Sequence, residues 1–197
     1  NLFNPAMVGR AFVMIAFASV LAAAGYQDAG STVDAVTQAT PLDAFKQSGA
    51  SVPLTALFLG LTNGSLGETS ALACLIGGLY LCIRRTASWE IPVGVLLAAA
   101  FFGGIANLAN PGADWTVLHH LLGGSLLFGA FFIATDPVSS PMTPKGKFIF
   151  GFGVGALIML LRLFSGYPEG VMFAVLLMNS LTPLINRWTI PKPLGAQ

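Results

Sequence analysis

The sequence predicts an all-α, polytopic membrane protein, and three observations lead to this fold class. Of the 197 residues, 55% are apolar and only 9% are charged, whereas a soluble domain carries about 25% charged residues. The apolar residues form long runs without alternation, which favours helices over a β-barrel. The low charge also excludes a disordered chain, a coiled coil and a nucleic-acid-binding protein. The two cysteines exclude a disulfide scaffold.

Five runs are long and apolar enough to be membrane-spanning helices, because a bilayer core of ~30 Å needs ~20 residues of helix. They are Met7–Gly25, Ile91–Ala109, Trp115–Thr135, Phe148–Phe164 and Val171–Ile185. We treat residues 1–197 as one transmembrane domain. Because the chain starts at Asn1 without a signal sequence before its first apolar run, we expect a piece of a longer protein.

A sixth crossing is expected from two shorter apolar pieces, Pro53–Leu61 and Thr69–Ile83. At 1.5 Å per residue, the first piece reaches only about halfway across a bilayer. We therefore expect a broken crossing, made of a half-helix, an irregular stretch and a second helix. Irregular backbone at this depth is tolerated only where protein buries it or where it lines a cavity.

Two segments on spans that run from outside to inside share a Gly-Gly pair: Leu75–Leu81 and Leu121–Leu127. An internal duplication is one interpretation. The other is that small residues recur because they let packed membrane helices approach closely.

The distribution of Lys and Arg predicts the orientation, because cytoplasmic loops are enriched in these residues. Counted over alternate loops, seven lie on one side and two, Lys46 and Arg162, on the other. The seven are Arg10, Arg84, Arg85, Lys145, Lys147, Arg187 and Lys192. We therefore expect both ends of the chain in the cytoplasm and residues 26–52 in an external loop. Arg162 is expected close to the outside, with its charge snorkelling outward; an inward-facing role with a partner is the less favoured interpretation.

The polar residues of the expected break allow two interpretations. Ser65 and Glu68 have the spacing of a capping box, in which Ser caps a helix and Glu returns to the Ser amide. Alternatively, the start of the second piece is a ligand site, as in the broken helices of transporters. An acid at membrane depth is costly unless it is paired or functional. Both interpretations hold together if Glu68 caps the helix beside a bound group.

Other polar residues have simpler explanations. Asn4 precedes Pro5, and Asn caps helices while Pro suits their first turn. His119 and His120 are interpreted as ordinary polar residues at the external interface. Cys74 and Cys82, ~12 Å apart along one helix, are interpreted as packing residues rather than a disulfide. Asp136 is interpreted as the start of a turn.

Thr40 lies in the external loop, within Asp34–Leu42. Because it precedes a proline, we expect an extended conformation that presents its side chain. A threonine hydroxyl has little nucleophilicity at neutral pH, and no base stands beside it in the sequence. These physical considerations alone leave Thr40 an ordinary exposed residue.

Four clusters, taken together, resemble the flavin-bearing membrane subunit shared by the Rnf and Na⁺-translocating NADH:quinone reductase complexes, the RnfD/NqrB family. They are Asn4–Ala6, Asp34–Leu42, Gly64–Ser70 and Thr135–Pro141, in this order over most of the chain. Gly67–Ser70 together with the run Arg84–Trp89 looks closer to the Rnf type.

The resemblance implies a covalent flavin on Thr40. In the family, a threonine of an external Ser/Thr-Gly-Ala-Thr motif is esterified to the phosphate of FMN by a separate flavin transferase. Thr40 corresponds to that threonine, with Thr37 at the start of the motif and Asp34 before it. Gln38 stands where Gly is usual, and a side chain there can hinder the transferase or tighten the loop.

The resemblance also implies a urea-channel-like bundle and further contacts. By that analogy the expected break lies in the bundle interior beside a flavin, which makes Glu68 and Thr69 candidate cofactor contacts. Members of the family are also thought to hold a non-covalent riboflavin, for which Asn4 is a candidate contact.

The implied function is electron relay in an ion-translocating complex of the bacterial cytoplasmic membrane, as a subunit rather than as an enzyme by itself. Its implied partners are the other subunits, the periplasmic flavin transferase and the lipid bilayer, with no nucleic acid. The coupling ion, Na⁺ or H⁺, stays open. Two alternatives stay open as well: a channel or transporter for a small polar solute, and a structural subunit that only holds its neighbours together.

Overall fold

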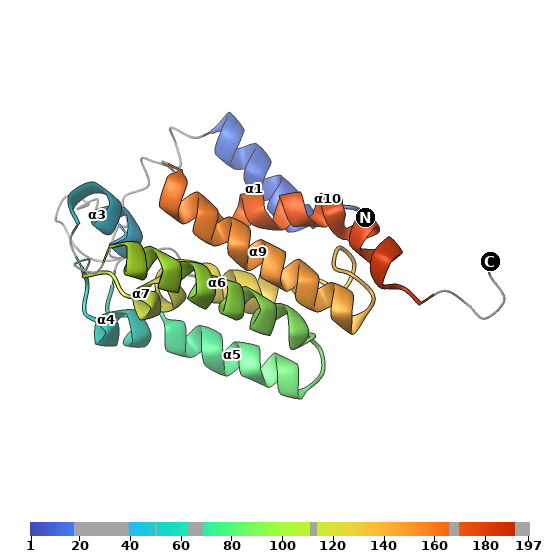
Figure 1. Cartoon of the computed structure of the whole chain (residues 1–197), viewed down its shortest axis with the longest axis horizontal. Helices are drawn as coiled ribbons and strands as arrows, with labels where there is room; N and C mark the ends of the chain where they lie inside the picture. Colours follow the sequence, from blue (N-terminus) through green and yellow to red (C-terminus); the bar gives the residue numbers. More distant parts are fainter. Residues whose placement is uncertain (18–39, 50, 63–68, 111–113, 166–169, 192–197) are drawn as a thin grey trace, which may run out of the picture.

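The computed structural model describes residues 1–17, 40–49, 51–62, 69–110, 114–165 and 170–191, which form a helical bundle without a β-strand (Figure 1). The elements are α1 (Pro5–Ala16), α3 (Pro41–Ser48), α4 (Leu54–Leu59), α5 (Ala71–Ile83), α6 (Glu90–Ala109), α7 (Val117–Leu122), α8 (Leu126–Phe128), the π-helix η1 (Gly129–Ile133), α9 (Pro144–Phe164) and α10 (Val171–Thr189). The all-α prediction is confirmed for these residues.

Two helices, α6 and α9, are long and apolar enough to cross a membrane. They contain the predicted spans Ile91–Ala109 and Phe148–Phe164. The predicted span Val171–Ile185 is also a helix, α10, which has Pro183 in its interior. Of the predicted span Met7–Gly25, the described part ends at Phe17, directly after α1. Six crossings therefore remain a prediction.

The centre of the bundle is the contact between α6 and α9. At this contact the backbones of the two helices approach each other closely at glycine residues. A Cβ built on Gly94 would lie 2.8 Å from the carbonyl oxygen of Phe148, and one on Gly155 would lie 2.5 Å from that of Val95. Only glycine permits this approach. Helix α10 packs on α9, and α1 packs on α10 (Figure 1). The buried core includes Ile91, Val95, Leu126, Phe150, Val154, Ile158, Met159 and Val175.

The two helical pieces that were predicted around the first break are present, with a different cap on the second. Helix α4 ends at Gly60, whose φ of 93° is a left-handed conformation that suits glycine. Helix α5 begins at Ala71, and the Ser70 side chain caps it by accepting a hydrogen bond from the Ala73 N–H at 3.2 Å. The expected capping box at Ser65 therefore does not start this helix. Residues 63–68, including Glu68, lie outside the described residues.

The prediction of one continuous helix over Trp115–Thr135 is wrong, because this segment is broken as well. Helix α7 stops at Leu122, Gly124 has a φ of 70°, and the chain continues as α8 and η1. In η1 the Ala134 N–H donates to the Gly129 carbonyl at 2.8 Å, five residues back, which defines a π-helix. Helix α4 contacts α7, and α5 contacts α8 and η1, so the two broken helical segments lie side by side.

The two Gly-Gly pairs do not occupy equivalent positions. Gly77 and Gly78 lie inside α5, where a Cβ on Gly77 would lie 3.0 Å from the Phe132 ring. Gly123 and Gly124 form the break after α7. The similarity in the structure is instead between the two short helices that lead into the breaks, α4 and α7, each of six residues.

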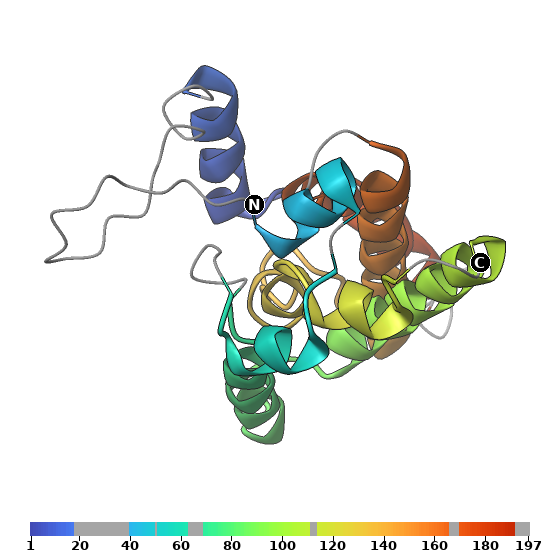
Figure 2. The ribbon, with the colours of Figure 1, turned by 90° about the vertical axis from the view of Figure 1, so that its left-hand side faces the viewer.

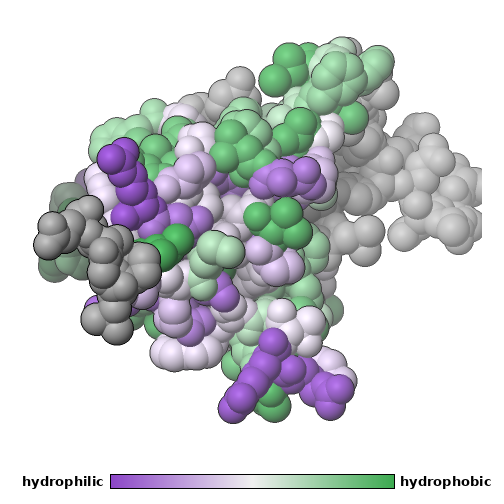
Figure 3. Space-filling model, turned by 90° about the vertical axis from the view of Figure 1, so that its right-hand side faces the viewer, coloured by the Kyte–Doolittle hydropathy of each residue, from purple (hydrophilic) through white to green (hydrophobic). Residues whose placement is uncertain are grey.

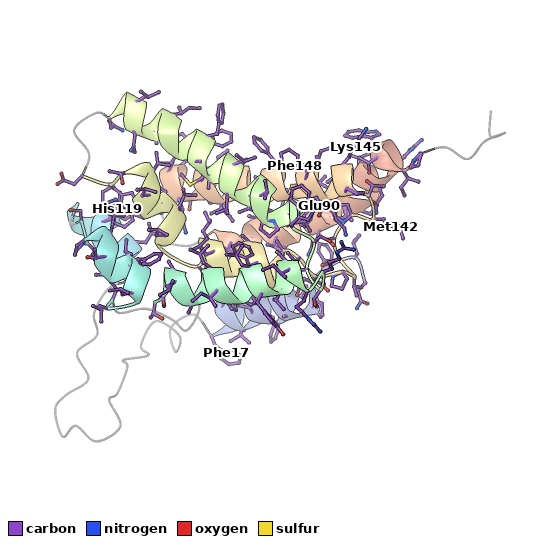
Figure 4. The ribbon with its side chains drawn as sticks, turned by 90° about the horizontal axis from the view of Figure 1, so that it is seen from below. Phe17, Glu90, His119, Met142, Lys145 and Phe148 are labelled. Carbon is purple, nitrogen blue, oxygen red and sulfur yellow. The ribbon has the colours of Figure 1, made fainter. Side chains whose placement is uncertain are left out.

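The helices alternate in direction, so the segments that carry Arg84, Arg85, Lys145, Lys147 and Arg187 gather at one end of the bundle. The end of α5, the starts of α6 and α9 and the end of α10 meet there (Figure 1), and Figure 3 shows hydrophilic side chains on that face. Glu90, Met142 and Lys145 lie at this end and His119 at the other (Figure 4). This grouping agrees with the predicted arrangement of loops. Which side of a membrane each end faces stays a prediction.

Candidate functional site

A cavity of about 500 Å³ lies at the His119 end of the bundle, beneath α3. Figure 2 looks onto this end, with α3 lying across the bundle. The cavity is lined by Leu42, Phe45, Lys46, Ala106, Asn107, Asn110, Trp115, His120, Arg162, Leu163 and Ser165. Residues 41–48 of the predicted external loop form helix α3, and this helix helps to enclose the cavity.

Helix α3 is anchored to the bundle on both sides. The Phe45 ring stacks on Trp115, with ring centroids 4.4 Å apart. The Lys46 ammonium donates to the Ser165 carbonyl, at the end of α9, at 3.0 Å. Leu42, at 2% exposure, packs inside. Thr40 is half-buried directly before this helix, and its carbonyl accepts the Ala44 N–H at 2.8 Å.

His120 is buried, at 5% exposure, and its tautomer follows from its partner. The Trp115 indole N–H donates to His120 Nδ1 at 3.3 Å. Because an indole nitrogen only donates, Nδ1 must be unprotonated, and the ring carries its proton on Nε2. Trp115 itself is 1% exposed. In the amide orientation that satisfies both partners, Asn107 Nδ2 donates to the Trp115 carbonyl and Asn107 Oδ1 accepts the Val117 N–H, both at 3.1 Å.

His119 connects the two broken helical segments. Its Nδ1 accepts the Thr116 N–H at 3.1 Å, so its proton also lies on Nε2, which donates to the Val52 carbonyl at 3.0 Å. His119 lines a second cavity of about 500 Å³ with Asp114 and the residues before α4. Both histidines, interpreted as ordinary polar residues at the external interface, are buried and hold defined backbone or indole partners.

Arg162 is buried at 4% exposure, so the expectation that it snorkels outward is wrong. Its two terminal nitrogens donate to the carbonyls of His120 at 2.6 Å and Gly123 at 3.0 Å. These carbonyls lie at the end of α7, where helical partners are missing. A guanidinium suits this role because it presents several donors in a fixed plane. Arg162 thus satisfies the backbone at the second break.

A further cavity, of about 400 Å³, lies at the opposite end of the bundle. It is lined by Asn1, Asn4, Pro5, Leu81, Thr86, Ala87, Phe131, Phe132, Thr135, Asp136, Pro137 and Val138. Its walls come from α1, α5, η1 and the turn after η1, so it lies where the π-helix departs from regular geometry. Such π-turns are frequent at functional sites.

Asn4 holds the start of α1 against this cavity. Its Oδ1 accepts the N–H groups of Ala6 at 3.0 Å and Met7 at 3.3 Å, which confirms the predicted cap. Its Nδ2 donates to the Ile133 carbonyl at 3.4 Å. In the amide orientation that satisfies its partners, the oxygen of the buried Asn179 side chain accepts the Asn4 N–H at 3.0 Å. Asn4 therefore joins α1, η1 and α10.

Asp136 starts a turn, as predicted. Its carboxylate accepts the Val138 N–H at 3.3 Å and the Ser139 hydroxyl at 2.8 Å. The Ser139 carbonyl in turn accepts the Thr182 hydroxyl of α10 at 3.1 Å. The carboxylate that lines the cavity is therefore fixed by its own turn.

The predicted site residues lie in different places. Asn4 and Thr40 lie at opposite ends of the bundle, and Thr69 is half-buried just before the cap of α5. Asp34, Thr37 and Glu68 lie outside the described residues. Within the part of the chain that the structure describes, no group of three His, Cys, Asp or Glu side chains could hold a metal. Cys74 and Cys82 do not form a disulfide.

Sequence reasoning did not identify Trp115, His120 and Arg162 as members of one site. Two signals in the sequence pointed toward them: a pair of adjacent histidines at the start of a span, and an arginine inside an apolar run. An ionisable residue in a membrane segment is a candidate functional residue in its own right.

Comparison with known proteins shows relatives over the whole chain. The NQR2, RnfD, RnfE family matches residues 1–195. One relative is a subunit of the proton-translocating ferredoxin:NAD(+) oxidoreductase complex of Clostridium ljungdahlii. The chain is 43% identical to it over 213 residues, covering 100% of the chain and 62% of that relative.

Two further relatives give the same result. A subunit of the Na(+)-translocating ferredoxin:NAD(+) oxidoreductase complex of Acetobacterium woodii is 42% identical, over 96% of the chain and 58% of the relative. A subunit of the ion-translocating oxidoreductase complex of Stutzerimonas stutzeri is 40% identical, over 99% of the chain and 64% of the relative. The chain thus spans about three fifths of the length of the relatives it matches.

Proposed function

Because the chain belongs to the NQR2, RnfD, RnfE family, we propose that it works as part of the RnfD-type subunit of an ion-translocating oxidoreductase complex. In this proposal it lies in the bacterial cytoplasmic membrane with the other subunits of the complex. A flavin transferase attaches FMN to Thr40 on the external side, and the flavin relays electrons between the cofactors of the complex.

The position of Thr40 is the observation that supports this proposal. Thr40 is half-buried directly before α3, and α3 is held over a cavity by the Phe45–Trp115 stack and the bond from Lys46 to Ser165. A cofactor esterified to Thr40 would therefore be tethered beside a hollow of suitable size, since small-molecule sites typically measure ~300–1,000 Å³. Bound FMN would supply the electron-transfer chemistry, while the chain supplies placement.

A tether of this kind fixes the local concentration of the cofactor near its redox partners. The chain also offers a second place for a flavin, the Asn4 cavity at the opposite end, where the sequence resemblance implies riboflavin. One crossing lines both cavities: Trp115 and His120 line the first, and Phe131 and Asp136 line the second. This connection supports a relay that runs along the bundle.

The test is a comparison of three full-length proteins, each expressed with the transferase. Wild type and Thr55→Ala, a control at an exposed threonine of α4, should gain the mass of an FMN ester and give a fluorescent band on a denaturing gel. Thr40→Ala should show neither. A Thr40→Ala protein that kept the added mass would contradict the assignment, and a wild type without it would contradict the flavin relay itself.

Transport of a small polar solute is the second candidate, favoured by the two broken crossings that lie side by side. Broken helices are common at the substrate sites of transporters. This function predicts solute flux into vesicles that contain the purified protein without redox partners, and no mass added to the chain.

A further inference from the structure

We propose that the end of α5 binds an anionic phospholipid, with the guanidinium groups of Arg84 and Arg85 on its phosphate and the outward face of α5 against an acyl chain. The ligand class is a phospholipid with a net negative headgroup, such as phosphatidylglycerol. This inference goes beyond the electron relay, since it needs no flavin. It rests only on the membrane location in the proposed function.

The first argument is the backbone of Arg85. Helix α5 ends in a Schellman motif, in which the Arg85 N–H donates to the Cys82 carbonyl and the Thr86 N–H to the Leu81 carbonyl, both at 3.0 Å. Arg85 has a φ of 55° and is the only non-glycine residue with a positive φ among those that the structure describes. Glycine is usual at this position, because a Cβ raises the energy of the left-handed conformation. An arginine kept there at a cost to folding is a candidate functional residue.

The second argument is that both guanidinium groups are exposed and lack a counter-ion. Neither side chain forms a hydrogen bond or a salt bridge with any residue in the described part of the chain. Of the acids described at this end, Asp136 is bound to its own turn. Glu90 lies in the first turn of α6, where the helix dipole favours a carboxylate. Two adjacent free cations attract an anion, and guanidinium groups match the oxygens of a phosphate.

The third argument is the apolar stripe that leads to the arginines. Ile76, Leu79, Tyr80 and Ile83 have helical spacing and are each more than half exposed. The stripe is about 10 Å long, at 1.5 Å per residue. The opposite face of α5 packs on η1, since a Cβ on Gly78 would meet the Phe131 ring. The exposed stripe therefore offers an acyl chain an apolar surface that ends at the two cations.

The fourth argument is the pair of aromatic residues at the level of the arginines. Tyr80 lies one helical turn before Arg84, and Trp89, which is also more than half exposed, directly precedes α6. Tyr and Trp are enriched at the headgroup level of membranes, because each combines an apolar ring with a polar group. At the lower edge of Figure 3, where α5 ends, hydrophilic side chains lie beside hydrophobic ones. The order of apolar, aromatic and cationic groups follows that of a phospholipid from its chain to its phosphate.

An acidic protein is the other partner that this charge could attract. A specific protein interface buries about 800 Å² on each partner, and charged residues are depleted from its centre. The two arginines instead end an apolar stripe that runs along one helix. A single phospholipid supplies both the anion and the apolar chain in this arrangement, so the lipid is the favoured partner.

The experiment measures lipid binding to the full-length protein in detergent by native mass spectrometry, with phosphatidylglycerol and phosphatidylcholine as probes. Wild type is compared with Arg84→Gln, Arg85→Gly and Arg85→Lys. Arg187→Gln is the matched control, because it removes one positive charge from an exposed position at the same end of the bundle.

Wild type should bind phosphatidylglycerol more tightly than phosphatidylcholine. A basic residue near an anionic lipid surface contributes about 1 kcal/mol, which corresponds to about fivefold in affinity. Arg84→Gln and Arg85→Gly should therefore each lower the affinity for phosphatidylglycerol about fivefold and leave that for phosphatidylcholine unchanged. Arg85→Lys should keep most of the affinity, because the charge remains, and Arg187→Gln should stay close to wild type.

Arg85→Gly also separates binding from stability. Glycine accepts the φ of 55° without strain, so the melting temperature should stay at or above that of wild type while the affinity for phosphatidylglycerol falls. If Arg85 served only to stabilise the end of α5 through the helix dipole, this variant would melt at a lower temperature and bind lipid as wild type does. That result would overturn the inference.

Three other results would also overturn it. They are a wild type without preference for phosphatidylglycerol, an equal loss of affinity in Arg187→Gln, which indicates diffuse attraction to surface charge, and displacement of the lipid by an equal concentration of inorganic phosphate. Loss of a co-purified subunit from the Arg84→Gln and Arg85→Gly proteins, with lipid binding unchanged, would identify an acidic protein as the partner instead. In all these cases the proposed function stands, whereas recovery of wild type without detergent in the soluble fraction would overturn the membrane location first.

Discussion

Arg162 donates two hydrogen bonds to backbone carbonyls within an apolar bundle. Hydrogen bonds to charged groups contribute more to folding stability than neutral ones. A buried carbonyl that loses its donor is left with an uncompensated desolvation penalty. Arg162 therefore contributes to stability chiefly by satisfying the end of α7, and this contribution can be measured apart from any cofactor.

Replacement by methionine, Arg162→Met, should lower the free energy of unfolding by about 3 kcal/mol, because two buried carbonyls lose charged donors. Arg162→Lys, with a single ammonium in place of a planar fork, should lie between this variant and wild type. Unfolding followed in detergent by circular dichroism measures the effect. Arg10→Met, at an exposed position of α1, is the control; a loss as small as that of the control would contradict the role assigned to Arg162.

At the scale of elements, the α6–α9 pair is joined through backbone at glycine positions. A Cβ on Gly155 would lie 2.5 Å from the Val95 carbonyl and 2.9 Å from the Ala98 side chain. Because both helices are long and central, neither can shift without moving its other neighbours. The pair therefore forms the centre against which the broken helical segments pack.

The substitution Gly155→Ala should destabilise the protein by about 1–3 kcal/mol, since the helices must separate to admit one methyl group. Gly104→Ala in α6 is the matched control, because no atom lies within 4 Å of its Cβ position. That control should be neutral or more stable by up to ~1 kcal/mol, because alanine is the better helix former. Thermal unfolding in detergent compares the two, and equal melting temperatures would argue against close contact at Gly155.

The long helices were predictable from the sequence, but the second break was not. Apolar runs of sufficient length predicted α6, α9 and α10, and the short piece before Gly60 predicted the first break. Gly77-Gly78 and Gly123-Gly124 read alike in the sequence, yet the first pair continues a helix and the second ends one. The difference arises from Arg162, which satisfies the carbonyls of the second break from a helix some forty residues later in the chain.

The candidate site was predictable only in part for the same reason. Asn4 and its cap follow from neighbours in the sequence, so the pattern predicted them. The cavity beneath α3 combines Phe45, Trp115, His120 and Arg162 from separate segments. Their association depends on tertiary packing, which no local pattern reports.

At the scale of the whole molecule, the two ends differ in what they present. One end carries the basic termini of α5, α9 and α10, and the other carries α3 with the cavity beneath it (Figures 1 and 2). If basic residues mark the cytoplasmic side, Thr40 and the cavity face outward, where the proposal needs them.

Labelling of single cysteines with a membrane-impermeant maleimide tests this orientation in a background with Cys74→Ala and Cys82→Ala. Asp114→Cys, at an exposed position on the His119 side, should be labelled in intact cells. Met142→Cys, 77% exposed at the basic end, should be labelled only after lysis. The reverse pattern would place Thr40 inside the cell and exclude its modification by an external enzyme.

The π-helix between Gly129 and Ile133 determines how this crossing responds to a change in chain length. Its hydrogen bond spans five residues where an α-helix spans four, so the turn contains one surplus residue. Deletion of Ala130 would convert the turn to regular α-helix and leave the flanking faces in register with their neighbours. The same deletion within α9 would rotate every later side chain by about 100° and misalign the helix along its length.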